Sequence, residues 1–187
     1  MKSISKDELN IFDEQKAAFR FLFETVNLDD VVFVGGVADY LNLRDHFELP
    51  VHDIDISYYN DQVIEDLSQK ISLEKHNSRF YDCDSYEVHI GKFYIGKKRV
   101  HFDLFRPNFS YCGIATSELL GRTVQHSCFD TMRRLHNDHI SQFTSKATAQ
   151  DYNWNRLYKH SRKAGLYNLI TYRKEKGTNE IKESLHV

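Results

Sequence analysis

The strongest chemical signal in this sequence is a pair of aspartates separated by one isoleucine, in residues 51–57, VHDIDIS. Side chains alternate along a β-strand, so Asp53 and Asp55 are predicted to project from one face and the isoleucines from the other. Two carboxylates on one side of a strand repel each other unless a cation lies between them. Carboxylate oxygens suit Mg²⁺, which proteins hold with few ligands together with substrate phosphates. The pair therefore indicates phosphoryl or nucleotidyl transfer.

Several predicted elements position these carboxylates. The run 31–34 is wholly apolar and β-branched, which favours a short strand buried on both faces. A diglycine, Gly35-Gly36, turns the chain from that strand into a helix predicted to begin near Val37. The aspartate pair lies in the next predicted strand. A third aspartate, Asp103, stands in an equally apolar stretch of a later strand.

Helices and further strands are predicted around this centre. Apolar residues recur at helical spacing in segments 13–26 and 61–71, so each is predicted to be a helix. Strands are predicted around 86–90 and 92–95, followed by a basic turn. A last strand is predicted over 99–105, and a proline-containing segment is expected to close the sheet after it.

The pattern becomes helical from about residue 129, where apolar residues again recur at helical spacing. A second helical stripe is predicted from Trp154 to Tyr158. The order of elements predicts an α+β fold: a small mixed β-sheet with flanking helices, followed by a helical C-terminal part. We expect residues 1–112 to form the α/β core and 113–187 to form the helical region, which ends in a polar tail.

Composition limits the class of protein. The chain has 187 residues, with 25 basic and 27 acidic side chains and a formal charge of −2, so overall charge does not favour nucleic acid. Cys83, Cys112 and Cys128 are an odd number without C-x-x-C spacing, which indicates reduced thiols. The N-terminal residues lack a signal-peptide pattern, and no apolar run reaches the roughly 18 residues of a membrane span. A cytoplasmic protein is expected.

The diglycine turn, the Asp-Ile-Asp strand and the later Asp103 together resemble the nucleotidyltransferase superfamily typified by DNA polymerase beta. The closest resemblance is to its minimal branch, the aminoglycoside and lincosamide nucleotidyltransferases, through segments 33–40 (FVGGVADY) and 51–56 (VHDIDI). Segment 121–127 also resembles the connector that leads into the helical half of such proteins. The sequence departs from the family at Pro50 and Val51, where an arginine often stands. It also departs where Val37 replaces a serine.

The resemblance implies a fold, a reaction and a set of site residues. Gly35 and Gly36 would bind the triphosphate at the turn that opens a helix. Asp53 and Asp55 would bind Mg²⁺ that bridges the phosphates. Asp103 would complete the site of a second Mg²⁺ or act as general base on the acceptor hydroxyl. That hydroxyl would attack the α-phosphorus in line, with pyrophosphate leaving.

Three cations are candidate nucleotide-binding residues. Arg106 directly follows the strand that contains Asp103, so its side chain is a candidate for a phosphate contact. Lys146 and Lys159 are chosen by resemblance, because a basic residue from the helical half often contacts the triphosphate in this superfamily. Basic helix faces are more often simply solvated, which is the alternative for both lysines.

The acceptor is not fixed by these residues. The resemblance favours a small hydroxyl-containing molecule of the aminoglycoside kind, for which Asp82, Asp84 and Glu87 would form an acidic rim. One alternative is a toxin-like enzyme that acts on transfer RNA or on a protein hydroxyl, through the basic and aromatic residues of the C-terminal half. Another is a catalytically inactive nucleotide-binding or partner-binding module.

Histidine is abundant, with ten copies, which makes a zinc site a further candidate. His136 and His139 lie three residues apart on a predicted helix, and His126 precedes Cys128 by two residues. No second close pair supplies a four-ligand set with the usual zinc spacing. These histidines are therefore predicted to be solvated or core residues.

Overall fold

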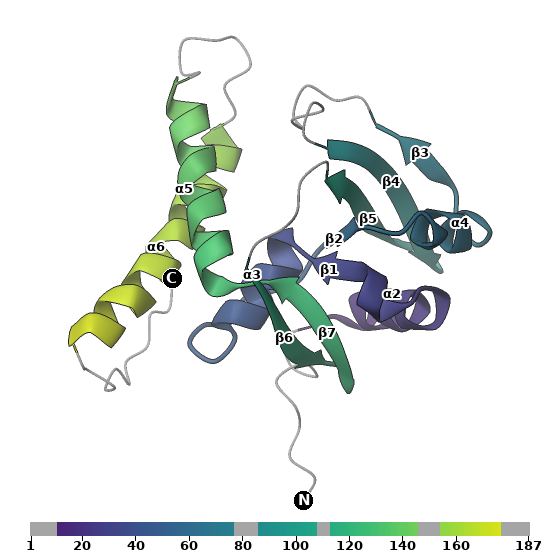
Figure 1. The fold of residues 1–187 in the computed structure, drawn as a ribbon, viewed down its shortest axis with the longest axis horizontal. Coiled ribbons are helices and arrows are strands. Elements are labelled where there is room, and N and C mark those ends of the chain that lie inside the picture. The colour runs from purple at the N-terminus through teal and green to yellow at the C-terminus, as the bar shows by residue number, and fades with distance from the viewer. Residues whose placement is uncertain (1–10, 77–85, 108–112, 146–153, 177–187) are drawn as a thin grey trace, which may run out of the picture. The chain divides into compact units, whose positions relative to one another are not determined.

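The computed structural model describes residues 11–76, 86–107, 113–145 and 154–176, in which helices and strands alternate up to residue 68 and five consecutive strands then precede two C-terminal helices (Figure 1). The described strands are β1 (Val31–Phe33), β2 (Ile54–Tyr58), β3 (Leu73–Lys75), β4 (Tyr86–Ile95), β5 (Lys98–Pro107), β6 (Ile114–Leu119) and β7 (Arg122–Ser127). The described helices are α2 (Asp13–Thr25), the 3₁₀ helix η1 (Leu28–Asp30), α3 (Gly35–Leu43), α4 (Gln62–Ser68), α5 (Phe129–Ser145) and α6 (Trp154–Lys176).

The strands form one mixed sheet in the order β3-β4-β5-β2-β1-β7-β6. The β2–β5 and β1–β7 pairs are parallel, and the remaining four pairs are antiparallel. The α+β prediction is confirmed: the structure has a mixed sheet with flanking helices and a helical C-terminal part. The strand that contains Asp55 lies in the interior of this sheet, between β1 and β5.

An apolar cluster covers one face of the sheet at β2 and β5, and it determines which way the aspartates of these strands project. Ile54 and Ile56 of β2 are completely buried, as are Phe102 and Leu104 of β5. They pack with apolar residues of α2, α3 and α4 in one cluster. Because side chains alternate along a strand, burying these residues directs Asp55 and Asp103 to the opposite face. The packing of the core therefore fixes which way the carboxylates project.

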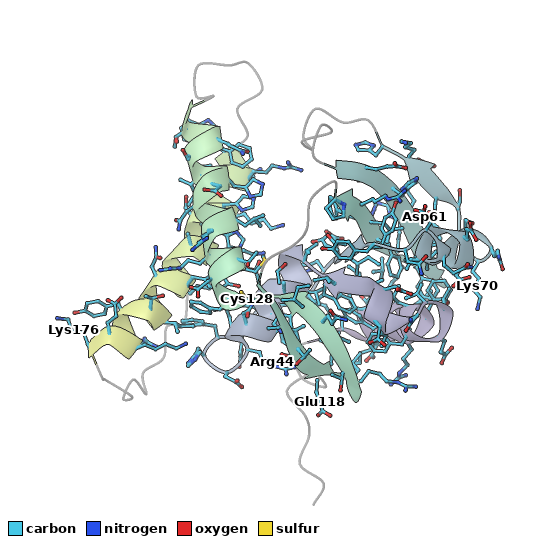
Figure 2. All side chains as sticks on the ribbon, viewed as in Figure 1. Arg44, Asp61, Lys70, Glu118, Cys128 and Lys176 are labelled. Atoms are coloured by element: carbon cyan, nitrogen blue, oxygen red, sulfur yellow. The ribbon has the colours of Figure 1, made fainter. Side chains whose placement is uncertain are left out.

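The sheet continues beyond residue 112, where the sequence predicted that the helical part begins. Residues 114–127 form the β6–β7 hairpin, and β7 pairs with β1. Asn42 Nδ2 at the end of α3 donates a hydrogen bond to the Ser127 carbonyl at 2.9 Å. Arg44 Nη1 donates to the Glu118 carbonyl at 2.8 Å, and both residues are labelled in Figure 2. The segment predicted to be a connector is thus an edge hairpin held against α3.

The chain divides into two compact units, residues 1–132 and 133–187. In the second unit α5 and α6 run antiparallel, since His136 contacts Tyr167 while Phe143 contacts His160. The helical stripe predicted from Trp154 to Tyr158 lies in α6, where both aromatic residues are exposed, and the buried residues of α6 are Ala164, Tyr167 and Ile170. No helix among the described residues is long and apolar enough to cross a membrane.

Candidate functional site

Two of the three aspartates lie side by side. Asp55 of β2 and Asp103 of β5 are direct partners in a parallel ladder. Neighbouring strands are about 4.8 Å apart, and laterally paired residues project from the same face. Both side chains are half-buried, and the residues on either side of Asp103 belong to the core. The structure therefore brings together two carboxylates that are far apart in the sequence.

The diglycine turn lies against this pair. The backbone N–H of Gly36 donates a hydrogen bond to Asp55 Oδ2 at 3.2 Å, and the N–H of Val34 donates to the Asp55 carbonyl at 2.9 Å. The Asp55 carboxylate thus caps the start of α3, where Val34 provides no side-chain cap and where negative charge is favourable. The hydrogen bond from Gly36 therefore connects the turn predicted to bind phosphate with Asp55, which is predicted to bind the metal.

The two glycines have different surroundings. Gly35 has φ of +53°, in the left-handed region, and a Cβ there would overlap the Asp55 carboxylate, with its Cγ 2.8 Å away. A Cβ at Gly36 would meet no heavy atom of the described residues within 4 Å. Gly35 is therefore needed by the protein itself, whereas Gly36 borders open space that a ligand could occupy.

Asp53 is exposed and lies at a bend directly before β2. Within the described ranges, no group of three or more His, Cys, Asp or Glu side chains has the geometry to hold a metal ion. The three aspartates therefore do not form a closed metal site by themselves. Mg²⁺ in phosphate-transfer sites is typically held by one or two carboxylates together with substrate phosphates. The paired Asp55 and Asp103, with Asp53 two residues along the chain, fit that kind of site.

A glutamine that the sequence analysis did not single out braces the segment before the aspartates. Gln15 of α2 is buried, and its Nε2 donates a hydrogen bond to the His52 carbonyl at 3.0 Å. The signal was present in the sequence, since Gln15 falls on the apolar stripe of the helix predicted over 13–26. Ser57, also overlooked, is completely buried on the carboxylate face two residues after Asp55.

Arg106 does not lie on the face of the carboxylates. It is three residues after Asp103 in β5, so alternation places it on the opposite face. Its Nη1 forms an ion pair with Asp61 Oδ1 at 2.8 Å. Tyr58 lies nearby on that face, and burial, followed by the charge of Glu87, raises the pKa of Tyr58 to about 12. The position of Arg106 gives no support to the phosphate contact predicted for it.

The other predicted binding residues remain untested. Lys146, Asp82 and Asp84 lie outside the described residues. Lys159 is an exposed residue of α6, and its triphosphate contact stays a prediction. Glu87 bonds to Lys75 Nζ at 3.1 Å, which lowers the pKa of its carboxyl, and it pairs across the sheet with Arg106. The acidic rim proposed for a polycationic acceptor thus has no described member on the carboxylate face.

Three histidines gather between α5 and α6 in the helical unit. His136 is buried, and its Nδ1 lies 2.9 Å from His160 Nδ1, so a hydrogen bond between them requires one ring nitrogen to be protonated and the other not. The ring of His139 stacks on that of His160 with centroids 4.3 Å apart. Burial, followed by the neighbouring His139 and His136, lowers the pKa of His160 from 6.5 to about 3.

We expect the helical unit to lose stability as the pH falls from about 6.5 towards 3. An unfolded histidine binds a proton near pH 6.5, whereas folded His160 stays neutral until about pH 3. Between these values the unfolded chain binds more protons, so the free energy of unfolding decreases as the pH decreases and is unaffected by this group above 6.5. Trp154 is the single tryptophan of the chain and lies in α6, so its fluorescence can follow thermal unfolding.

The variant His160→Gln should have a smaller pH dependence of the unfolding temperature, because the titrating ring is removed while a hydrogen-bonding side chain remains. His46→Gln is the matched control, since His46 is an exposed histidine of the other unit. An unchanged pH dependence in His160→Gln would contradict the assignment.

No known family model matches this sequence, and no curated protein matches it. Among solved structures, a protein of Thermotoga maritima described as a putative nucleotidyltransferase is 14% identical with a TM-score of 0.46, covering 88% of this chain and 96% of its own. JHP933 of Helicobacter pylori is 11% identical with a TM-score of 0.38, covering 89% and 96%. Neither likeness is close enough to assign a function, which has to be inferred from the site.

Proposed function

We propose that this protein is a magnesium-dependent nucleotidyltransferase that moves a nucleoside monophosphate from a nucleoside triphosphate to a hydroxyl group. The observation that carries the proposal is the pairing of Asp55 with Asp103 beside the Gly35-Gly36 turn. Paired carboxylates next to the N-terminus of a helix combine a place for a hard cation with a place for phosphate oxygens. The weak likeness to a protein described as a nucleotidyltransferase agrees with this reaction but does not support it independently.

The side chains have separate roles in the proposed reaction. Asp55 and Asp103 would hold Mg²⁺ together with the phosphates, and Asp53 would contribute on nucleotide binding. Bound there, Mg²⁺ would neutralise charge on the triphosphate. Asp103 is also the candidate general base, taking the proton of the acceptor hydroxyl. The hydroxyl oxygen would form a bond to the α-phosphorus as the bond to pyrophosphate breaks.

The start of α3 would hold the triphosphate. The N–H of Gly36 is bonded to Asp55, but the first N–H groups of a helix lack partners within the helix and commonly bind anions. The absence of a side chain at Gly36 leaves room for a phosphate oxygen to approach the backbone. The same turn would thereby orient the phosphates relative to both carboxylates.

The acceptor is the less constrained part of the proposal. A small hydroxyl-containing molecule of the aminoglycoside kind is supported only by the sequence resemblance. A nucleic-acid acceptor is favoured by one structural observation, the strongly basic composition of α6. A catalytically inactive nucleotide-binding module would bind triphosphate without releasing pyrophosphate.

We expect the protein, incubated with Mg²⁺ and triphosphates labelled at the α-phosphorus, to release pyrophosphate and transfer label to a component of a cell extract. Triphosphates labelled at the γ-phosphorus are the control, and should leave their label in pyrophosphate. Chelating the metal should stop both events, and adding Mg²⁺ should restore them. Fractionation into small molecules, RNA and protein then identifies the acceptor. Transfer of the γ-label, or transfer that persists after chelation, would contradict the proposal.

A further inference from the structure

Charge is divided unevenly between the two units of the chain. Residues 1–132 contain 14 basic and 22 acidic side chains, whereas residues 133–187 contain 11 basic and 5 acidic ones. The overall charge of −2 therefore conceals an acidic unit and a basic unit. Within α6 there are seven lysines and arginines and one acidic residue, Glu175. The far end of this helix is also basic, with Lys176 labelled in Figure 2.

The same helix exposes large aromatic rings. The exposed fractions are 71% for Trp154, 68% for Tyr158 and 56% for Tyr172. Trp154 and Tyr158 are four residues apart, so they lie on one face of the helix, and Arg162 continues that face one turn later. Lys159 and Arg162 are both exposed beside these rings. Exposed rings aligned with cations on one helix face are more informative than scattered surface aromatics.

We propose that the first turns of α6, residues 154–162, bind single-stranded nucleic acid. Aromatic rings stack on unpaired bases of any sequence, and neighbouring basic side chains contact the phosphates, which is how many proteins bind single strands. Trp154 and Tyr158 would stack on bases, while Lys159 and Arg162 would contact phosphates. The surface would therefore bind single strands of RNA or DNA without strong sequence preference.

The chemistry of α6 favours this ligand over the other partners of a basic helix. A membrane-surface helix needs an apolar face for the lipid, but the apolar side of α6 is covered by α5, as the contact of Tyr167 with His136 shows. A duplex keeps its bases stacked internally, so it would use the cations but not the exposed rings. An acidic protein surface would likewise leave Trp154 and Tyr158 without a specific role.

Binding can be measured with the full chain and fluorescently labelled oligonucleotides of uridine and of thymidine. We expect binding that weakens as salt increases, together with a change in Trp154 fluorescence from stacking. Tyr158→Ser should weaken binding at least about fivefold, because one base-stacking contact is lost. Lys159→Glu combined with Arg162→Glu should weaken it at least about tenfold and reduce the salt dependence.

Matched controls separate this surface from general charge effects. Tyr94→Ser removes a comparably exposed tyrosine, and Lys97→Glu combined with Arg122→Glu makes the same change of charge, both in the sheet unit. These controls should bind as the unaltered protein does. Equal losses in the controls and the α6 variants, no loss in the α6 variants, or equal affinity for a duplex would each overturn the proposal.

This inference depends on α6 alone and not on the proposed transfer reaction. Oligonucleotide binding without pyrophosphate release would support the nucleic-acid surface and argue against the transferase. Pyrophosphate release without oligonucleotide binding would support the transferase and argue against the nucleic-acid surface. If both are present, the fraction of extract that receives the label shows whether the bound strand also supplies the acceptor hydroxyl.

Discussion

Replacing Asp55 or Asp103 by asparagine is expected to lower nucleotidyl transfer at least about 100-fold, the scale of losing one group that stabilises charge in the transition state. Asparagine has the size of aspartate and keeps one carbonyl oxygen, so Asp55→Asn can still accept the hydrogen bond from Gly36. The change removes the negative charge that binds Mg²⁺ while preserving the local structure. The rate of pyrophosphate release measures the effect, and circular dichroism checks the fold.

Asp29→Asn provides the matched control, because Asp29 is an exposed carboxylate of the same unit at the end of the sheet away from the diglycine turn. Its transfer rate should stay within about twofold of the unaltered protein, as expected for an uninvolved surface carboxylate. A second readout is the Mg²⁺ dependence of triphosphate binding, which both site variants should weaken. Normal transfer in Asp55→Asn and Asp103→Asn would exclude this pair as the metal site.

Replacing Asp53 by alanine distinguishes a metal site with three aspartate ligands from one in which only Asp55 and Asp103 bind the metal. The sequence predicts that Asp53→Ala abolishes turnover, whereas the structure shows Asp53 exposed and outside any three-ligand group of the described residues. If Asp53 becomes a ligand when nucleotide arrives, Asp53→Ala will lose transfer as severely as Asp55→Asn does. A mild loss would restrict the metal ligands to Asp55 and Asp103.

The direction in which Asp55 projects could be predicted from the sequence. Side chains alternate along a β-strand, so it is enough to know that the segment is a strand and which of its residues are buried in the core. Ile54 and Ile56 are apolar and must be buried, so the aspartate between them has to face away. The alignment of Asp55 with Asp103 is different, since it depends on the register of two strands separated by a helix and two further strands. Register follows from packing of the whole sheet, which a local pattern does not encode.

The β6–β7 hairpin was missed because its turn lacks the usual residues. The two-residue turn is Leu120-Gly121, with φ of 49° and 77°. Asparagine or glycine is the usual residue at the first such position, and leucine is strained there. β6 is also polar at three consecutive positions, 116–118, and exposed at every second position up to Glu118, so it has little apolar pattern. Tertiary pairing of β7 with β1 stabilises the hairpin against a local sequence that does not favour it.

The surroundings of three side chains, Arg106, Trp154 and Tyr158, could not be predicted from the sequence. Arg106 was predicted to reach a phosphate because it follows the strand of Asp103, but one-residue alternation turns it towards Asp61. Trp154 and Tyr158 have helical spacing, and spacing alone does not show whether an aromatic face is buried or exposed. For Arg106 and for the two aromatic residues, the sequence predicted the strand or helix that contains them. It did not predict which residues their side chains would contact.

Gly35→Ala is expected to destabilise the protein and lower transfer together. The left-handed conformation at Gly35 costs an alanine about 1–2 kcal/mol, and the new Cβ would also displace the Asp55 carboxylate. The unfolding free energy, measured by denaturant titration, should therefore fall by at least that amount. The transfer rate should fall as well, since the displaced group is a proposed metal ligand.

Gly36→Val tests the position of the same turn at which a Cβ would have no described neighbour. Unlike Gly35→Ala, it should leave stability nearly unchanged and weaken triphosphate binding. A Cβ at this position would meet no described heavy atom within 4 Å, and valine suits a helix at least as well as glycine does, so the unfolding free energy should change by less than about 1 kcal/mol. If phosphate oxygens approach the backbone there, triphosphate affinity should nevertheless drop at least about tenfold, because the branched side chain fills their place. Unchanged affinity in a stable Gly36→Val protein would show that the triphosphate binds elsewhere. Weakened binding with retained stability would place the triphosphate at this turn, because the described residues put no heavy atom within 4 Å of a Cβ there.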